Sequence, residues 1–272
     1  MAYTVALLDG ELVDLATVRL DQFSSGFFFG CGLFETLVLE GGQPQFLGRH
    51  LARLRRGLAA LPAVRGPQNG ALLEPAAFAA PLAAALARCD EAQGARPDVM
   101  KITASDGRVL VTFRDAPPDR ARQQREGVEI SALDRAGYRA GDPLINHKTL
   151  SYLKQYSVMA ENPLFVNERG EVCEGPTSNV FAVFDDRIVT PPVSAPCLPG
   201  IVREVLLEAG RLGGRPLVEE PLPLEALEQA RGCFLTNSVS IALPVRRLLG
   251  RPLAESVELA ALARAAMAGA AG

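Results

Sequence analysis

Apolar positions recur with helical spacing in residues 46–58. Leu47, Leu51, Leu54 and Leu58 fall on one side of the helix that this spacing predicts, and four arginines fall between them. An amphipathic helix with a buried leucine face is therefore expected here. A second, alanine-rich helix is expected to end at Cys89, after an irregular stretch at residues 62–75.

Runs of β-branched and other apolar residues predict strands on either side of these helices. Residues 3–8 and 11–13 flank Asp9-Gly10, a pair typical of a tight hairpin turn. Residues 33–39 form a further apolar run. Residues 99–103 and 109–113 flank the turn-forming stretch 105–108, which predicts a second hairpin.

The pattern after residue 126 predicts a strand at 127–132 and then a helix. Leu150, Leu153, Tyr156, Ser157 and Ala160 keep the spacing of one helix face. Lys148 stands just before this helix. Residues 164–166 and a run that ends at Cys173 flank a turn at 167–170, which predicts a hairpin.

The last third of the chain predicts strands at residues 180–184 and 188–192, followed by a helix at 204–212. A further strand begins at Gly232, meets a hydroxyl-rich turn, and resumes before Pro244. The alanine-rich residues from Leu253 onward predict a closing helix.

A change of composition marks the expected domain boundary. Residues 115–120, DAPPDR, combine charge and proline and break the regular pattern. We therefore expect an N-terminal domain over residues 1–115, an interdomain linker over 116–125, and a C-terminal domain over 126–272 that carries Lys148.

Residues 24–32, SSGFFFGCG, form a glycine-rich segment with three aromatic side chains. The expected structure is a tight turn packed on a core. A phosphate-binding P-loop is disfavoured because the G-K-[ST] ending is absent.

Composition indicates an ordinary soluble globular protein. The 272 residues are 48% hydrophobic and 22% charged, with a formal net charge of -3, which gives no sign of nucleic-acid or membrane binding. The five cysteines lack C-x-x-C spacing and the histidines number two, so no metal site is expected. The start of the chain reads as a strand and not as a signal peptide, and no apolar run reaches bilayer length. We expect a cytoplasmic protein.

Lys148 and Glu174 suggest covalent chemistry. A lysine at a strand-to-helix junction can form a Schiff base, and a carboxylate brought back by a hairpin can tune the ring of a cofactor. Each residue alone is typical of a solvated surface. Their spacing, together with the Pro176-Thr-Ser-Asn179 segment after Glu174, gives the functional interpretation its weight.

The segments KTLSYL, beginning at Lys148, and NERGEVCEGPTSN, ending at Asn179, resemble the class IV family of pyridoxal-phosphate (PLP) aminotransferases, also called fold type IV. The resemblance implies a mixed α+β/α/β architecture with a small N-terminal α/β domain and a larger C-terminal domain with a β-barrel-like sheet and helices. It also implies PLP as the cofactor. Lys148 would then bind the cofactor aldehyde and move a proton, and Glu174 would face the pyridine nitrogen.

Three further segments resemble the family's phosphate-binding elements. The H-x-x-R-L pattern assigns phosphate contact to Arg53, whose planar fork suits phosphate oxygens. The L-P-G-I-V-R segment assigns it to the backbone of Gly200, Ile201 and Val202, with Val202 in place of the usual threonine. The T-N-S segment assigns it to Ser238.

Other site residues follow from position in the sequence. Tyr152 is expected to border the cofactor and help set the lysine pKa. Arg108 and Lys101 are candidates for holding a substrate carboxylate, and Glu35 lies in the G-x-G-x-F-E-T segment, which lines the pocket in the family. The family also implies a homodimer and a small-molecule substrate.

The residues leave the reaction open between two outcomes. The D-amino-acid branch usually carries an arginine and histidine pair in this loop, whereas the short 105–108 loop here has no histidine, and the T-N-S segment differs from the branched-chain motif. The closer resemblance is to aminodeoxychorismate lyase, which releases pyruvate and 4-aminobenzoate for folate synthesis. The alternative is an aminotransferase for a branched-chain or related amino acid with 2-oxoglutarate. A non-catalytic binding protein on the same fold would have no reason to hold Lys148, Glu174 and Arg53 together.

Overall fold

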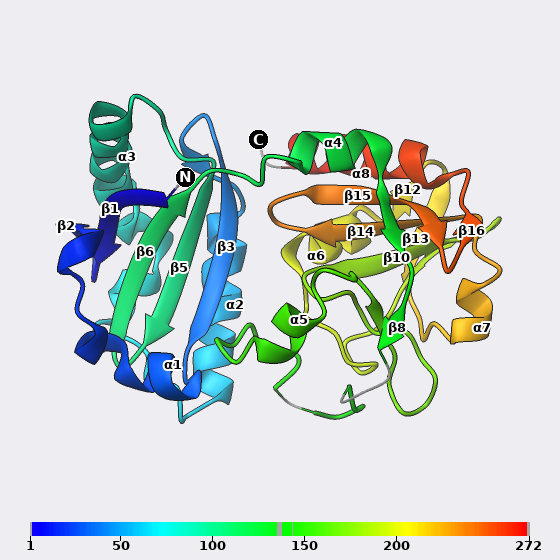
Figure 1. The fold of residues 1–272 in the computed structure, drawn as a ribbon, viewed down its shortest axis with the longest axis horizontal. Coiled ribbons are helices and arrows are strands. Elements are labelled where there is room, and N and C mark those ends of the chain that lie inside the picture. The colour runs from blue at the N-terminus through cyan, green and yellow to red at the C-terminus, as the bar shows by residue number, and fades with distance from the viewer. Residues whose placement is uncertain (1, 135–137, 143, 271–272) are drawn as a thin grey trace. The chain divides into compact units, whose positions relative to one another are not determined.

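The computed structural model describes residues 2–134, 138–142 and 144–270. It divides into two compact units, which are described separately. The first unit is Met1–Pro118 with Lys148–Tyr152, and the second is Asp119–His147 with Leu153–Gly272 (Figure 1). Lys148, expected in the C-terminal domain, thus belongs to the first unit.

The first unit contains a six-stranded antiparallel sheet with the order β2-β1-β6-β5-β3-β4. The predicted hairpins and the 33–39 strand are confirmed. The strands are β1 (Ala2–Leu8), β2 (Glu11–Asp14), β3 (Leu33–Glu40), β4 (Gln43–Pro44), β5 (Val99–Ser105) and β6 (Arg108–Arg114).

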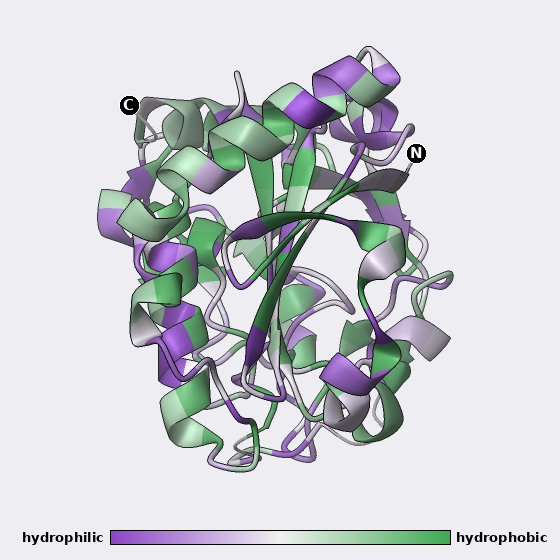
Figure 2. Ribbon diagram, turned by 90° about the vertical axis from the view of Figure 1, so that its left-hand side faces the viewer, coloured by the Kyte–Doolittle hydropathy of each residue, from purple (hydrophilic) through white to green (hydrophobic). Residues whose placement is uncertain are grey.

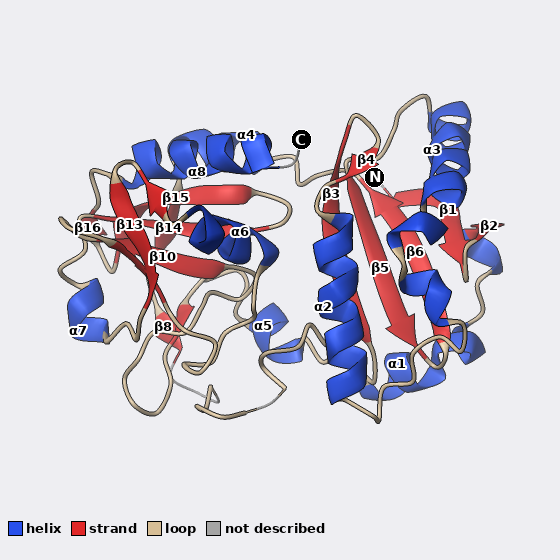
Figure 3. Ribbon diagram, turned by 180° about the vertical axis from the view of Figure 1, so that it is seen from behind, coloured by secondary structure: helices blue, strands red, loops and turns tan. Residues whose placement is uncertain are grey.

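Helices α2 (Leu47–Ala60) and α3 (Ala79–Gln93) cover one face of this sheet (Figure 3). The core joins leucines of α2 to the inward positions of the strands, such as Leu37 and Ile102. Because strand side chains alternate between faces, Phe34 and Lys101 lie on the opposite face. Short helices complete the unit: η1 (Leu15–Thr17), η2 (Leu20–Phe23), α1 (Ser24–Phe29), η3 (Gly70–Leu73) and η4 (Pro75–Ala77).

The second unit contains a mixed eight-stranded sheet with the order β12-β13-β11-β10-β14-β15-β16, in which β7 also pairs with β15. A two-stranded sheet joins β8 to β9. The strands are β7 (Val128–Ile130), β8 (Leu133–Asp134), β9 (Leu164–Phe165), β10 (Asn179–Val183), β11 (Ile188–Thr190), β12 (Arg211–Leu212), β13 (Arg215–Glu219), β14 (Gly232–Asn237), β15 (Ile241–Leu248) and β16 (Arg251–Pro252).

Five helices belong to the second unit: α4 (Arg120–Glu126), α5 (Leu153–Ser157), α6 (Ile201–Ala209), α7 (Leu224–Leu227) and α8 (Ser256–Ala270). Strands β10 and β11 are buried along their whole length. Figure 2, viewed from the side on which Figure 1 draws the first unit, shows mainly apolar, green residues along the central strands and both green and purple residues on the surrounding helices. Within the described ranges, every helix is too short or too polar to cross a bilayer.

Several expectations differ from the structure. Residues 120–126, expected within a linker, form α4, which packs on β15. The helix expected to run from Leu150 to Ala160 is shorter and covers only α5. Leu153 and Tyr156, which belong to its predicted face, are 81% and 73% exposed. The helix expected at 204–212 begins at Ile201 and ends before Gly210, whose left-handed φ of 71° terminates it.

The glycine-rich segment also differs, because residues 24–29 form helix α1 and not a turn. The Asp106 carboxylate, in the β5–β6 turn, accepts hydrogen bonds from the amides of Ser25 and Gly26 at 3.3 and 3.2 Å. An acidic group at a helix N-terminus satisfies amides that have no partner within the helix. This tertiary contact explains why local composition alone predicted a turn.

Candidate active site

The backbone around Lys148 is attached to the outer edge of β3. Phe34 N–H donates to the Lys148 carbonyl and Leu150 N–H donates to the Gly32 carbonyl, both at 2.9 Å. A Cβ on Gly32 would overlap the Leu150 side chain, so a glycine permits this close approach. The lysine is therefore held by extended backbone, and it does not start a helix.

Two aromatic rings surround the Lys148 ammonium group. Its Nζ lies 4.5 Å from the centre of the Phe34 ring and 5.6 Å from that of Tyr152, and the two rings meet edge to face. The electron-rich faces of aromatic rings attract cations. Tyr152 thus lies beside the lysine amine.

Arg53 in α2 belongs to a buried cluster with Glu35 of β3 and His50 of α2. Its Nε and Nη2 donate to the two oxygens of Glu35 at 2.8 and 2.6 Å, and Glu35 is only 1% exposed. His50 Nδ1 lies 2.6 Å from the same carboxylate. Burial alone would raise the pKa of Glu35, but the Arg53 charge and the His50 hydrogen bond lower it to about 2. Glu35 therefore positions Arg53, which is a different task from the expected substrate contact.

The folded protein favours the neutral form of His50, whereas it favours the charged form of Glu35. Burial lowers the pKa of His50 from the ordinary 6.5, with the Arg53 and Lys148 charges acting in the same direction against Glu35. The imidazole is accordingly neutral at pH 7, and its Nδ1 hydrogen is donated to the ionised Glu35. The cluster thus has one cation, one anion and one neutral ring.

This cluster predicts a specific loss of stability in acid. An unfolded chain protonates His50 below pH 6.5, and it protonates Glu35 below its ordinary 4.5, before the folded protein does either. Because the unfolded state then binds more protons, the free energy of unfolding falls as the pH falls through each range. Urea unfolding between pH 7.5 and 3 measures this loss.

The two histidines provide matched controls. Burial also lowers the pKa of His147, so both histidines contribute between pH 7 and 5. His50→Gln should reduce the slope in that range more than His147→Gln, because His50 is 1% exposed and His147 is not fully buried. A wild-type stability that stays constant from pH 7 to 3 would contradict the assignment of a neutral His50 and an ionised Glu35.

The other two expected substrate residues differ in their environment. Arg108 is paired with Asp9, whose carboxylate lies 2.5 Å from its Nη1. Lys101 Nζ lies over the Phe34 ring at 4.6 Å. Among the described residues, Lys101 has neither a carboxylate partner nor a side-chain hydrogen bond. Burial lowers its pKa, with the Arg114 charge acting in the same direction.

Glu174 lies in the second unit and receives hydrogen bonds from three elements. Tyr138 Oη donates to Oε1 at 3.0 Å, while Leu198 N–H and Asn179 Nδ2 donate to Oε2 at 3.0 and 3.4 Å. Hydrogen bonds to the charged form of a carboxyl favour its ionisation. Sequence analysis did not identify Tyr138 or the Leu198 amide, since neither a lone tyrosine nor a backbone group carries a motif.

Helix α6 begins beside Glu174 and Asn179. Gly200 is its N-cap residue and no side chain caps it, so its first amides remain donors for an anion. Asn179 Nδ2 also donates to the Leu198 carbonyl at 2.8 Å. A Cβ on Gly200 would overlap Asn179 Oδ1, although the φ of -70° suits any residue. The glycine is needed for space.

Filling this space gives a second prediction. Gly200→Ala should displace Asn179, destabilise the protein by about 1–3 kcal/mol, and weaken cofactor affinity about tenfold or more. Urea unfolding and absorption titration with the cofactor measure the two effects. Gly269→Ala in α8 is the matched control, because a Cβ there meets nothing within 4 Å and helical alanine is favoured. Equal behaviour of the two variants would contradict the steric account.

Ser238 lies in the turn between β14 and β15. Asn237 Oδ1 accepts hydrogen bonds from the amides of Val239 and Ser240 at 3.0 and 2.7 Å. From α4, Gln124 Nε2 donates to the Ser240 carbonyl at 2.8 Å. The turn that carries Ser238 is therefore fixed from both sides. Asn237 and Gln124 are positioning residues that sequence analysis did not identify.

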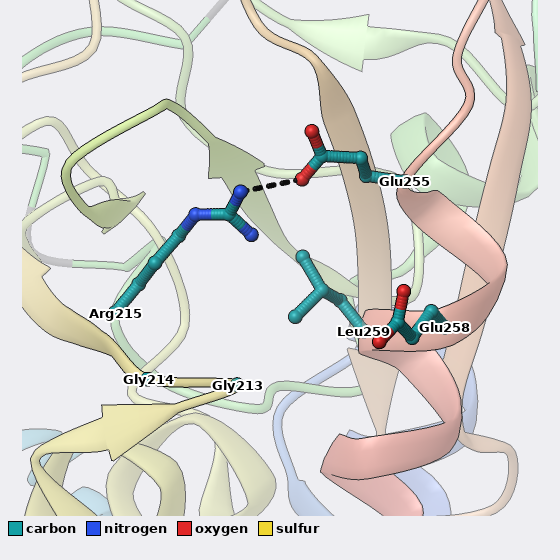
Figure 4. Close-up of a pocket in the computed structure, with 6 residues that line it drawn as sticks. All are labelled: Gly213, Gly214, Arg215, Glu255, Glu258 and Leu259. Atoms are coloured by element: carbon teal, nitrogen blue, oxygen red, sulfur yellow. Dashed lines mark ion pairs between the residues drawn. The ribbon is translucent and has the colours of Figure 1, made fainter.

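A separate pocket of about 510 Å³ lies between the β12–β13 turn and α8. Figure 4 shows that Arg215 and Glu255 face each other across it, and they form an ion pair at 2.7 Å. None of the residues discussed above lines this pocket. The described residues also contain no group of three or more His, Cys, Asp or Glu side chains placed to hold a metal.

The residue types present fit the groups of PLP. Lys148 provides a primary amine for an aldehyde, and Glu174 a buried carboxyl group for a ring nitrogen. The first amides of α6, which no side chain caps, provide donors for a phosphate. This donor set is what a phosphorylated pyridine aldehyde requires.

Comparison with known proteins gives a consistent result. The family model for class IV amino-transferases matches residues 32–248. A bifunctional aminodeoxychorismate lyase / D-amino acid transaminase of Mycobacterium tuberculosis is 29% identical over 278 residues, which cover 92% of each chain. The 4-amino-4-deoxychorismate lyase of Pseudomonas aeruginosa is 28% identical and superposes with a TM-score of 0.75 over 96% of this chain and 98% of its own.

A further solved structure shares the fold. A hypothetical aminotransferase of Mycobacterium tuberculosis, solved in its PLP-bound form, has a TM-score of 0.80 at 23% identity and covers 98% of this chain and 99% of its own. The predicted fold type IV architecture is confirmed by these neighbours. Because the family model matches most of its length, this chain belongs to the PLP-dependent class IV aminotransferase family.

Proposed function

We propose that Lys148 binds the aldehyde carbon of PLP covalently and that Glu174 faces the pyridine nitrogen of the same molecule. Tyr152 borders the lysine and influences its pKa through the contact described above. The phosphate would be held by Arg53, by the backbone of Gly200, Ile201 and Val202, and by Ser238. Family membership and the fit of these residue types support the assignment.

The chemistry divides between cofactor and protein. PLP supplies an electron sink for the charge left when a proton departs from the carbon that bears the substrate amine. An ionised Glu174 keeps the ring nitrogen protonated, which strengthens that sink. The Lys148 amine would take that proton as a general base and return one as a general acid.

We propose 4-amino-4-deoxychorismate as the substrate, with folate synthesis as the destination of the product. Lys148 would remove the proton from the amine-bearing ring carbon, and the adjacent C–O bond would break to release enolpyruvate, which takes up a proton to become pyruvate. The ring becomes aromatic as 4-aminobenzoate. The observation that carries this choice is the similarity, over nearly the whole chain, to two proteins named for this lyase activity.

The position of Lys101 favours a substrate in which the carboxylate lies far from the amine. A half-buried cation without an anionic partner is costly unless a ligand supplies one. The ammonium groups of Lys101 and Lys148 lie 4.6 and 4.5 Å from one ring centre, so they are no more than roughly 9 Å apart. The ring carboxylate of aminodeoxychorismate lies opposite its amine, which suits such a pair.

Transamination is the alternative, and one relative carries both activities in its name. An amino acid with 2-oxoglutarate would use the same lysine and glutamate. The reactions differ in whether the substrate amine ends on an aromatic product or on the cofactor.

A single assay separates these reactions. Purified protein supplied with PLP is given aminodeoxychorismate, and 4-aminobenzoate and pyruvate are measured together. A parallel set receives branched-chain and other amino acids with 2-oxoglutarate, and glutamate is measured. Equimolar aromatic product and pyruvate are expected. Glutamate formation without aromatic product would overturn the lyase assignment.

We also propose that the protein is a homodimer. Helix α1 exposes three consecutive aromatic side chains, with Phe27, Phe28 and Phe29 being 64%, 65% and 76% exposed. Adjacent exposed aromatic residues are typical of a protein interface. Phe28→Asp should lower the mass measured by light scattering to that of a monomer, while Leu249→Asp, at an isolated apolar residue that is 37% exposed, should not. A wild-type monomer would contradict the proposal.

A further inference from the structure

Tyr138 connects Glu174 to a second aromatic ring. Its hydroxyl donates to Glu174 Oε1 at 3.0 Å, and its ring stacks on Phe165 with the centres 4.2 Å apart and the planes at 10°. Tyr138 and Phe165 are 2% and 0% exposed. The hydroxyl therefore has a fixed direction, because the ring cannot turn away without losing the stack.

Lys154 covers the same aromatic pair. Its Nζ lies 4.4 Å from the Tyr138 ring centre and 4.9 Å from that of Phe165. The side chain is half-buried, and burial lowers its pKa, against the charges of Asp134 and Asp142, which raise it. Of the 28 basic residues in the chain, only Lys101, Lys148 and Lys154 are lysines, and each lies over an aromatic ring.

We infer that Lys154 and Tyr138 form a positioning pair that tunes the carboxylate of Glu174. The cation over the phenol ring draws electron density from it, which makes the hydroxyl a stronger donor. The stronger hydrogen bond stabilises the ionised form of Glu174. This inference rests on the proposed role of Glu174 toward the pyridine nitrogen.

The arrangement has a direct consequence for the cofactor. A carboxylate of low basicity leaves the shared proton on the ring nitrogen, whereas a more basic carboxylate withdraws it. The ring then becomes a weaker electron sink, and it also withdraws less charge from the nitrogen of Lys148. Loss of either member of the pair should therefore change both catalysis and the titration of the bound cofactor.

The test uses the PLP-loaded full-length enzyme and the variants Tyr138→Phe, Lys154→Met and the double variant. For each, the pH midpoint of the visible absorption of the bound cofactor, the PLP dissociation constant, kcat and KM are measured. We expect the midpoint to rise in every variant. We expect kcat to fall about tenfold for Tyr138→Phe and about threefold for Lys154→Met, with little change in KM.

Coupling between the two residues is the decisive result. The double variant should be no worse than Tyr138→Phe, because Lys154 acts only through the hydroxyl. Lys154→Arg should retain the wild-type midpoint, and Arg125→Met, which removes an exposed charge from α4, is the matched control. An unchanged midpoint in Lys154→Met, or additive effects in the double variant, would overturn the inference. Cofactor attached to a lysine other than Lys148 would instead contradict the proposed function.

Discussion

Lys148→Ala should yield a folded protein that lacks the visible colour of bound PLP and has kcat reduced by about a thousandfold or more. The variant removes both the amine that binds the aldehyde and the base that moves the proton, and general acid–base catalysis alone contributes about 10²–10⁴-fold. The fold should survive, because the backbone hydrogen bonds at Phe34 and Gly32 do not use the side chain. Absorption spectra and steady-state rates measure these effects.

The small number of lysines makes the site of attachment unambiguous. Borohydride reduction of the loaded wild-type protein, followed by peptide mapping, should label Lys148 and neither Lys101 nor Lys154. Lys101→Ala is the matched control: it should keep its colour and lose affinity for the substrate. Label on Lys101, or a coloured Lys148→Ala protein, would contradict the assignment.

Glu174→Gln should keep the cofactor bound and lower kcat by about a hundredfold. Glutamine retains the shape of the side chain but has no charge to hold a proton on the ring nitrogen. Its oxygen can still accept from the Leu198 amide, while its NH₂ group can donate to the Tyr138 hydroxyl, so the local hydrogen bonds are retained with the Tyr138 bond reversed. Spectra and kinetics across the pH range measure the change.

Glu168→Gln provides the comparison for this result. Glu168 lies six residues earlier, is exposed, and accepts a hydrogen bond from the Ala140 amide at 3.1 Å. Its loss should leave kcat and the absorption spectrum unchanged. Similar rates for Glu174→Gln and wild type would show that the carboxylate is not needed for the electron sink.

Much of the fold follows from patterns that act within a few residues. The hairpin of β5 and β6 was predicted because its strands flank a turn of Asp106 and Gly107, and α2 because its leucines repeat along one face. Elements that depend on distant partners were not predicted. Helix α1 needs the Asp106 carboxylate at its N-terminus, and residues 148–152 need the edge of β3.

The site shows the same division. Side chains with distinctive chemistry, such as Lys148 and Glu174, were selected from the sequence, and their joint action on one cofactor stays a prediction. Groups that act by position alone were not visible: the Leu198 amide carries no sequence signal, and Tyr138 lies next to no motif. The pairing of Glu35 with Arg53 was not predicted, because it depends on how α2 packs against β3.

The hydrogen bond between Leu150 and Gly32 also means that the first unit cannot finish folding until residues 148–152 have been synthesised. A nascent chain that has reached only Pro118 contains β1 to β6, but the outer edge of β3 near Leu33 still lacks the residues that cover it. Contacts between such distant residues form slowly, and an uncovered strand edge is a template for pairing with other chains. Fragments that end before Tyr152 should therefore self-associate, and synthesis of the intact protein should depend on chaperones until that residue emerges from the ribosome.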